Sequence, residues 1–118
     1  MHVGLIGGIG PAATDFYYRS LIRRAADKGV KLDLTIAHAD SPTLLSNLAA
    51  DAHGDQSAIY TSLTDRLVRA GADCVVITSI SGHFCIDTFK PASALPVIDL
   101  MSVLKNWLAQ YGYKRVGI

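Results

Sequence analysis

Two stretches of this sequence carry residue types suited to holding a small anion. The first is GGIGPAAT, residues 7–14, in which three glycines precede a proline. A glycine turn that opens a helix presents backbone N–H groups to an anion such as phosphate or carboxylate. The second is ITSISGHF, residues 77–84, in which hydroxyl residues and a histidine follow an apolar run. Together the two stretches predict a ligand site, provided that the fold brings them to the same place.

Each stretch also has a purely structural interpretation. Glycines make tight strand-to-helix turns, Ser81 can cap a helix, and Ser79 can satisfy nearby backbone groups. The run from Gly8 to Ala13 also fits the G-x-G-x-x-G/A pattern of dinucleotide-binding domains, with Asp40 as the acid that would bind the ribose. The expected position of both stretches at one sheet edge favours a ligand site, and the dinucleotide alternative stays open.

The elements that must position these stretches alternate between strand and helix. Short continuous apolar runs are typical of strands buried on both faces. They occur at HVGLIG (2–7), LDLTIAHA (32–39), CVVITSI (74–80) and PVID (96–99), and helical periodicity covers the regions from Pro11 to Gly29, from Asp55 to Gly71 and from Leu100 to Gln110. This order predicts an α/β fold, a three-layer sandwich with a parallel four-stranded sheet whose first and third strands are neighbours.

Composition narrows the class of protein. The 118 residues are one domain's worth of chain, and half of them are hydrophobic. A net charge of +1 gives no electrostatic reason to expect a nucleic-acid or membrane partner. The N-terminus lacks the features of a signal peptide, and two cysteines do not make a disulfide framework. These features favour a cytoplasmic protein in a reducing compartment.

Three longer segments resemble one family. GLIGGIGPAAT followed by FYY, then RAGADCVVITSISGH, then LPVIDL are similar to the aspartate/glutamate racemase family, whose turn is GGMGP-x-AT and whose third strand ends in CNTAH. The resemblance implies two pseudo-symmetric α/β lobes with the active site between them. Residues 1–112 would be the N-terminal lobe, and residues 113–118 would begin a truncated second lobe, with KRVGI (114–118) as a new strand.

The resemblance also implies a reaction. Family members are cofactor-independent isomerases in which one cysteine from each lobe exchanges the α-proton of an amino acid. Here Ser79 occupies the first cysteine's position, so Ser79 is the implied catalytic residue, acting on an amino acid or related small carboxylate. No metal or cofactor is implied, and the implied partner is a second lobe or a second copy, without which the lobe would be inactive. The implied substrate-binding residues are Gly8, Ile9, Gly10, Asn47, Ile80, Ser81 and His83.

The departures from the family pattern matter for function. A serine hydroxyl is a far poorer base than a thiolate unless another group activates it. Cys74 lies at the start of its strand, which is the wrong end for a cleft at the carboxyl edge. A helix core position is expected for Cys85, and the alternative is a displaced nucleophile that approaches the cleft from the next helix. The loop after the second strand has no lysine or arginine between Lys31 and Arg66, which favours a substrate without a side-chain carboxylate. Three hypotheses remain: a racemase lobe, a dinucleotide-binding domain, and a non-catalytic relative that binds a small carboxylate.

Overall fold

The computed structural model describes residues 1–115 and is built around a parallel sheet. The sheet contains β1 (His2–Gly7), β2 (Asp33–His38) and β3 (Cys74–Ile77) in the order β2-β1-β3. Both pairings are parallel, with Gly7 opposite His38 and Ile6 opposite Ile77. The prediction that the first and third strands are neighbours is therefore confirmed. All three strands end at the same edge, which sets the place of the candidate site.

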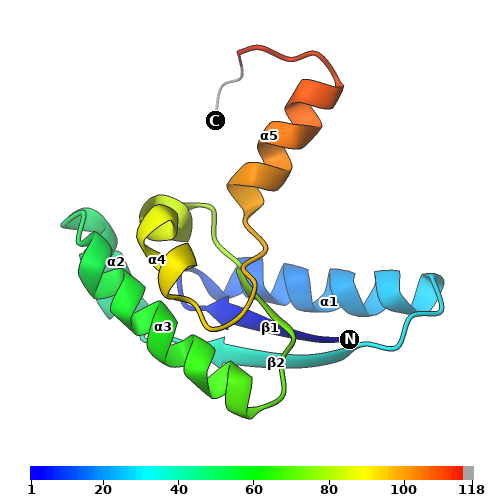
Figure 1. The fold of residues 1–118 in the computed structure, drawn as a ribbon, viewed down its shortest axis with the longest axis horizontal. Helices are drawn as coiled ribbons and strands as arrows, with labels where there is room; N and C mark the ends of the chain where they lie inside the picture. The colour runs from blue at the N-terminus through cyan, green and yellow to red at the C-terminus, as the bar shows by residue number, and fades with distance from the viewer. Residues whose placement is uncertain (116–118) are drawn as a thin grey trace.

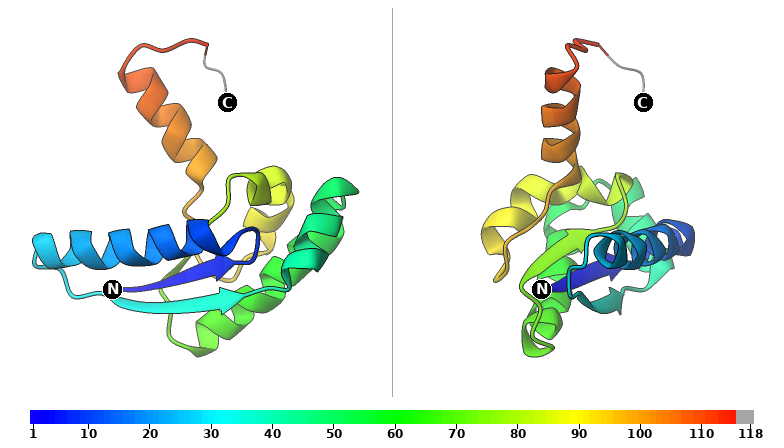
Figure 2. Two further views of the ribbon diagram at one scale, coloured as in Figure 1. Left: turned by 180° about the vertical axis from the view of Figure 1, so that it is seen from behind. Right: turned by 90° about the vertical axis from the view of Figure 1, so that its right-hand side faces the viewer.

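Helices cover both faces of this sheet, as Figures 1 and 2 show. One face carries α1, whereas α3 and α4 pack on the other, and α5 projects away from the rest of the structure. The helices are α1 (Pro11–Asp27), α2 (Ser41–Ala49), α3 (His53–Arg69), α4 (Ile86–Ala92) and α5 (Leu100–Gln110), with a 3-10 turn η1 (Ser81–Cys85) before α4.

Alternation along the central strand explains the two layers. Val3 and Leu5 point to the face covered by α1, where Tyr17 and Leu21 pack against them. Ile6 points to the opposite face and belongs to the larger core under α3 and α4. A strand with apolar side chains on both faces needs a helical layer on each side, as the continuous apolar runs predict.

The prediction of a fourth strand is wrong for the described residues, where the sheet has three strands. PVID (96–99) contributes only an isolated bridge, in which Val97 lies opposite Val75. The neighbours of Val97 limit this pairing, because Pro96 has no N–H to donate and Asp99 already caps α5. The third strand also ends at Ile77 instead of residue 80, since the chain then turns into η1.

The helix boundaries follow the sequence signals closely. Helix α1 begins at Pro11 and stops shortly before Gly29, which has a φ of 65°. Helix α3 begins two residues before the predicted start at Asp55, and α5 has the predicted bounds. Of the strand predicted at 114–118, the first two residues are irregular and the last three lie outside the described residues.

No helix within residues 1–115 is both long enough and apolar enough to cross a membrane.

Candidate functional site

The glycine turn and the hydroxyl stretch follow the carboxyl ends of neighbouring strands, β1 and β3. The Thr78 N–H and the Thr78 hydroxyl both donate to the carbonyl of Ile6, each at 3.1 Å. The hydroxyl oxygens of Thr14 and Thr78 lie 2.9 Å apart, which ties the first turn of α1 to the end of β3. The structure therefore joins the two stretches at one edge of the sheet, where ligands of open parallel sheets bind.

The conformation of the turn depends on glycine. Gly8 is buried with a φ of 145°, and a Cβ there would lie 2.6 Å from Leu44 Cδ1 and 2.7 Å from the carbonyl oxygen of Ala39. Gly10, with a φ of 78°, precedes α1 and offers no side-chain cap to it. The first N–H groups of a helix have no partner within the helix. Those of α1 thus lack a side-chain cap and suit an anion.

Ser79 is half-buried next to this turn, and its own turn fixes its side chain. Its Oγ accepts a hydrogen bond from the Gly82 N–H at 3.2 Å. Within residues 1–115 no side chain hydrogen-bonds to this Oγ, so no base in this part of the chain activates the hydroxyl. The hydroxyl proton is available for donation to a ligand instead.

His83 uses both ring nitrogens within the protein. Its Nε2 accepts the Leu100 N–H at 3.2 Å, which places the ring proton on Nδ1, and Nδ1 then donates to the carbonyl of Ser79 at 2.6 Å. The side chain is only 2% exposed. His83 therefore holds the Ser79 turn against the start of α5, and neither nitrogen is left for a substrate.

Asn47, predicted as a substrate contact, begins a chain of hydrogen bonds toward the same turn. Its amide donates to Gln56 Oε1 at 3.0 Å, and Gln56 Nε2 donates to the Tyr60 oxygen at 3.0 Å. The Tyr60 hydroxyl donates in turn to the carbonyl of Gly82 at 3.2 Å. Within residues 1–115, Asn47 is thus connected to the site through two other side chains, both of which are buried.

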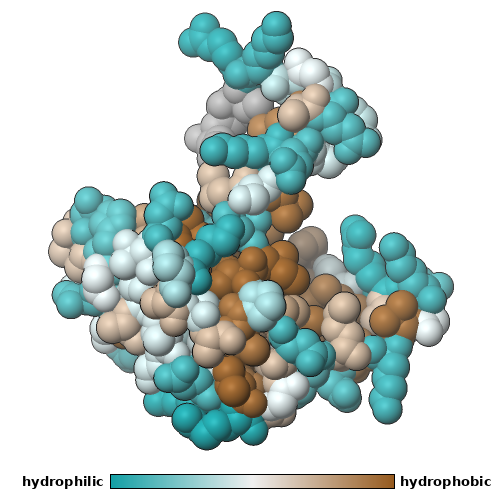
Figure 3. All heavy atoms as spheres, in the orientation of Figure 1, coloured by the Kyte–Doolittle hydropathy of each residue, from teal (hydrophilic) through white to brown (hydrophobic). Residues whose placement is uncertain are grey.

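The remaining predicted contacts differ in exposure. Ile9 is half-buried and packs against the larger core, whereas Ile80 and Ser81 are exposed. Ile80 lines an apolar hollow of about 260 Å³ between α1 and α5, with Tyr17 and Trp107 also in its wall. Figure 3 shows apolar side chains continuing from the base of α5 onto the rest of the structure. The surface beside Ser79 is therefore apolar on the α5 side.

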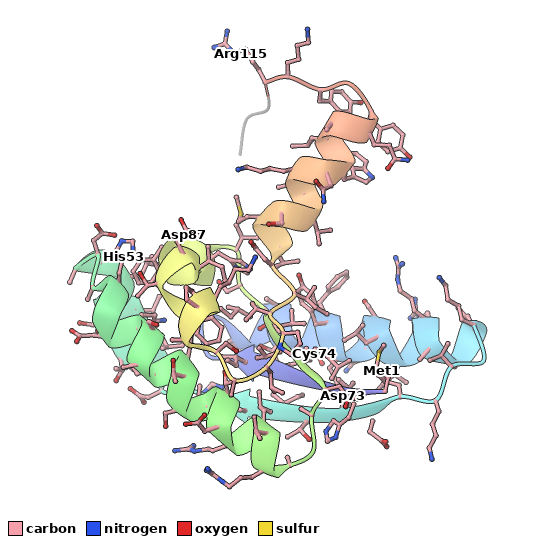
Figure 4. The ribbon with its side chains drawn as sticks, viewed as in Figure 1. Met1, His53, Asp73, Cys74, Asp87 and Arg115 are labelled. Carbon is pink, nitrogen blue, oxygen red and sulfur yellow. The ribbon has the colours of Figure 1, made fainter. Side chains whose placement is uncertain are left out.

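Neither cysteine supplies an accessible thiolate. Cys85 is fully buried, and burial raises its pKa to about 11. The pKa of Cys74 is also raised, first by burial and then by the charge of Asp73. Figure 4 shows Cys74 and Asp73 near Met1, at the end of the sheet where β1 begins. That end is opposite to Ser79, as expected from the position of Cys74 in its strand.

Asp40, the acid of the dinucleotide alternative, caps α2. One of its carboxylate oxygens accepts both the Thr43 N–H at 3.1 Å and the Thr43 hydroxyl at 2.6 Å. The Thr43 hydroxyl and N–H hold the pKa of Asp40 below its usual value. Both residues line a hollow of about 450 Å³ whose wall also contains Arg66 from α3. Asp40 is thus engaged in the capping of its own helix.

Several residues that shape the site were not predicted from the sequence. Thr14 was visible only as part of the glycine motif, and Gln56 and Tyr60 share an i,i+4 face of α3. Asp99 precedes a helical run, which is the signal of an N-cap. It accepts hydrogen bonds from the Met101 N–H and the Ser102 hydroxyl, each at 2.8 Å. Within the described residues no group of three or more His, Cys, Asp and Glu side chains is arranged to hold a metal ion.

Comparisons with known proteins identify the family of this chain and match its fold. A family model described as Asp/Glu/Hydantoin racemase matches residues 6–118. A crystal structure from Yersinia pestis, described as a "putative Asp/Glu Racemase", superposes with a TM-score of 0.83 at 22% identity. An aspartate racemase homologue from Pyrococcus horikoshii OT3 superposes with a TM-score of 0.75 at 20% identity. Each comparison covers 94% of this chain and 50% of the other, so the chain spans about half the length of the solved structures that it matches.

Proposed function

Since this chain belongs to the Asp/Glu/Hydantoin racemase family, we propose that it is one lobe of a cofactor-independent amino-acid racemase. The substrate would be an amino acid or a related small carboxylate, and the reaction would remove and return its α-proton. One observation carries the proposal: the Thr14–Thr78 contact and the Thr78–Ile6 hydrogen bonds place the glycine turn and Ser79 at one edge of the sheet.

The two parts of this edge suit different parts of such a substrate. The N–H groups at the start of α1 suit the carboxylate, because they present donors and the positive end of a helix dipole. The same donors would stabilise the charge that develops on the carboxylate when the α-proton leaves. The Ser79 hydroxyl, held by the Gly82 N–H, would donate a hydrogen bond beside the α-carbon.

This chain by itself does not supply both of the groups that the proton transfer requires. A proton transfer on each face of the α-carbon requires a group poised near the working pH on each side. Cys85 is buried with a pKa of about 11, and Cys74 lies at the opposite end of the sheet. We therefore place at least one of the two proton-transfer groups on a partner unit. That unit would be a second α/β lobe of the same polypeptide or another copy of this chain. The exposed apolar side chains of Val103 and Trp107 on α5 support a partner unit, which would cover them.

Exchange of the α-proton with solvent tests the proposal. The complete gene product would be incubated in D₂O with the L and D forms of aspartate, glutamate and one neutral amino acid. Deuterium at the α-carbon would be followed by NMR. We expect exchange in at least one enantiomer of one substrate from the complete product. Exchange by residues 1–118 alone would identify a second copy of this chain as the partner unit, whereas exchange by the complete product only would identify a second lobe. The absence of exchange from the complete product in all of them would contradict the racemase proposal.

A non-catalytic role is the second candidate, and a specific observation favours it. Ser79 replaces a thiol and, within residues 1–115, no basic side chain is bonded to its Oγ. A relative that only binds small carboxylates would show no exchange but would still bind. Saturation-transfer NMR with the same amino acids distinguishes this outcome, because it reports binding without turnover.

A further inference from the structure

A directional chain of hydrogen bonds runs through the buried layer behind Ser79. It begins at Asn47 on α2, passes through Gln56 and Tyr60 on α3, and reaches the carbonyl of Gly82 in η1. The N–H of the same Gly82 donates to Ser79 Oγ. Side chains from two helices, α2 and α3, are therefore linked to Gly82, the residue whose N–H holds the Ser79 side chain.

The donors and acceptors in this chain leave little freedom. Asn47 donates to Gln56 Oε1, which turns the Gln56 amide so that its NH₂ group faces Tyr60. Tyr60 accepts this bond and uses its only proton for Gly82. Burial raises the pKa of Tyr60 to about 12, so the hydroxyl remains a donor at neutral pH.

Burial and packing hold these hydrogen-bonded side chains in place. Gln56 is fully buried and Tyr60 is 1% exposed, so a broken hydrogen bond here could not be replaced by bulk water. The Tyr60 ring packs edge-on against Phe89, with ring centroids 5.5 Å apart. The packing around Gly82 is equally close, because a Cβ at this position would lie 2.7 Å from the Tyr60 oxygen.

We propose that Tyr60, oriented by Gln56 and Asn47, is a positioning residue that fixes Gly82 and thereby aims the Gly82 N–H at the side chain of residue 79. The resemblance to the family points to residue 79 alone. The residues that hold its turn lie elsewhere, on α2 and α3. The proposal rests on the proposed function only in naming Ser79 as the site. The effect of Tyr60 on the Gly82 N–H can be measured at position 79 without any catalytic turnover.

A thiol at position 79 provides the readout. In the Ser79→Cys variant of the complete gene product, the Gly82 N–H would stabilise the thiolate and lower the thiol pKa. Alkylation by iodoacetamide would be followed across pH, and mass spectrometry would assign the modification to position 79, separately from other cysteines. The midpoint of the rate profile gives the pKa of that thiol.

Adding Tyr60→Phe to Ser79→Cys keeps the ring and removes only the hydroxyl. We expect the midpoint to rise by about one pH unit, which is about a tenfold lower alkylation rate below the midpoint. Thr64→Val is the matched control, because the Thr64 hydroxyl is also fully buried on α3 but donates only to the Tyr60 backbone carbonyl. The control should lower stability and leave the midpoint unchanged.

Asn47→Ala gives a second, milder test, since Asn47 is half-buried and is the hydrogen-bonded residue farthest from Gly82. It should shift the midpoint in the same direction by less, and it decides the matter if Tyr60→Phe does not fold. An unchanged midpoint in the folded variant would overturn the proposal, as would an equal shift in Thr64→Val. A shift without any α-proton exchange by the parent protein would leave the positioning role standing and remove the racemase function. Exchange of the α-proton by the parent protein, without a shift of the midpoint in the variants, would support the racemase function and overturn the positioning role.

Discussion

The hydroxyl oxygens of Thr14 and Thr78 lie 2.9 Å apart, although 64 positions separate the two residues in the sequence. Thr14 belongs to the first turn of α1, and Thr78 immediately follows β3. Their contact sets the glycine turn beside the Ser79 turn. The two parts of the candidate site are therefore joined by this pair.

Thr78→Val should destabilise the protein by about 1–2 kcal/mol, because it removes a buried hydroxyl and leaves the Thr14 hydroxyl without this partner, while the Thr78 N–H still donates to the Ile6 carbonyl. Urea unfolding followed by circular dichroism gives the change in free energy. Thr61→Val is the control, since the Thr61 hydroxyl only supplements a helix carbonyl, that of Ser57. Equal losses in the two variants would contradict a special role for the Thr14–Thr78 contact.

The glycines of the turn should differ sharply in their tolerance of alanine. Gly8→Ala should cost about 3 kcal/mol or more, because backbone strain is added to contacts with Leu44 and Ala39. Gly10→Ala should cost about 1–2 kcal/mol, since its positive φ is strained but the space around it is open. Gly54→Ala, in the open first turn of α3, should instead stabilise by about 0.5–1 kcal/mol. Thermal unfolding would rank the three, and a Gly8→Ala protein as stable as Gly10→Ala would argue against the packing described.

Stability should fall in alkali because of Cys85. Burial raises its pKa from 9.0 to about 11, so between these values the unfolded chain loses the thiol proton while the folded chain keeps it. The contribution of the thiol is thus complete below pH 9 and is lost as the pH rises through the folded pKa. Urea unfolding at neutral pH and between pH 9 and 11 measures the loss. Cys85→Ala should lose less stability over that interval, and an identical loss in parent and variant would show that Cys85 is not its source.

Acid should weaken the start of α5. Burial raises the pKa of Asp99, but hydrogen bonds from Ser102, the Met101 N–H and Lys90 outweigh it and hold that pKa below the usual 3.8. The carboxylate therefore stabilises the fold above pH 3.8, and this contribution disappears as the pH falls through the lowered value. Asp99→Ala should cost about 1 kcal/mol at neutral pH, as expected for loss of an N-cap.

Amide hydrogen exchange locates the effect of Asp99→Ala. The faster exchange should be confined to α5 and the η1 turn, because Asp99 also lies 4.0 Å from His83 Nε2. Asp40→Ala provides the comparison, since Asp40 caps α2 and its faster exchange should stay there. Faster exchange spread over the whole sheet in Asp99→Ala would contradict a local role.

Changes at Ser79 should separate its two possible contributions to catalysis. In the complete gene product, Ser79→Cys should raise α-deuterium exchange on its own face by about tenfold or more, because a positioned thiolate is an effective base near neutral pH. Ser79→Ala should lower exchange if the hydroxyl positions the substrate. NMR of each enantiomer in D₂O measures both. Unchanged exchange in both variants would remove Ser79 from the site.

Much of the fold was predictable because local chemistry and tertiary structure agree. The apolar runs at 2–7 and 32–39 form strands, Pro11 starts α1, and Gly29 and Gly71 follow helix ends with positive φ. The predicted fourth strand failed for a physical reason. A short apolar run has the same appearance whether it pairs along its length or, like Val97, at a single bridge.

The sequence by itself determined the family, the parallel arrangement of strands, and the two stretches that meet at the sheet edge, because motif spacing and periodicity are local properties of the chain. Only the tertiary structure decided which polar groups are already engaged. It turned both nitrogens of His83 inward, connected Asn47 to Gly82 through Gln56 and Tyr60, and paired Ser79 Oγ with the Gly82 N–H. Hydrogen-bond partners far apart in the chain are chosen by packing, and residue type alone does not specify them.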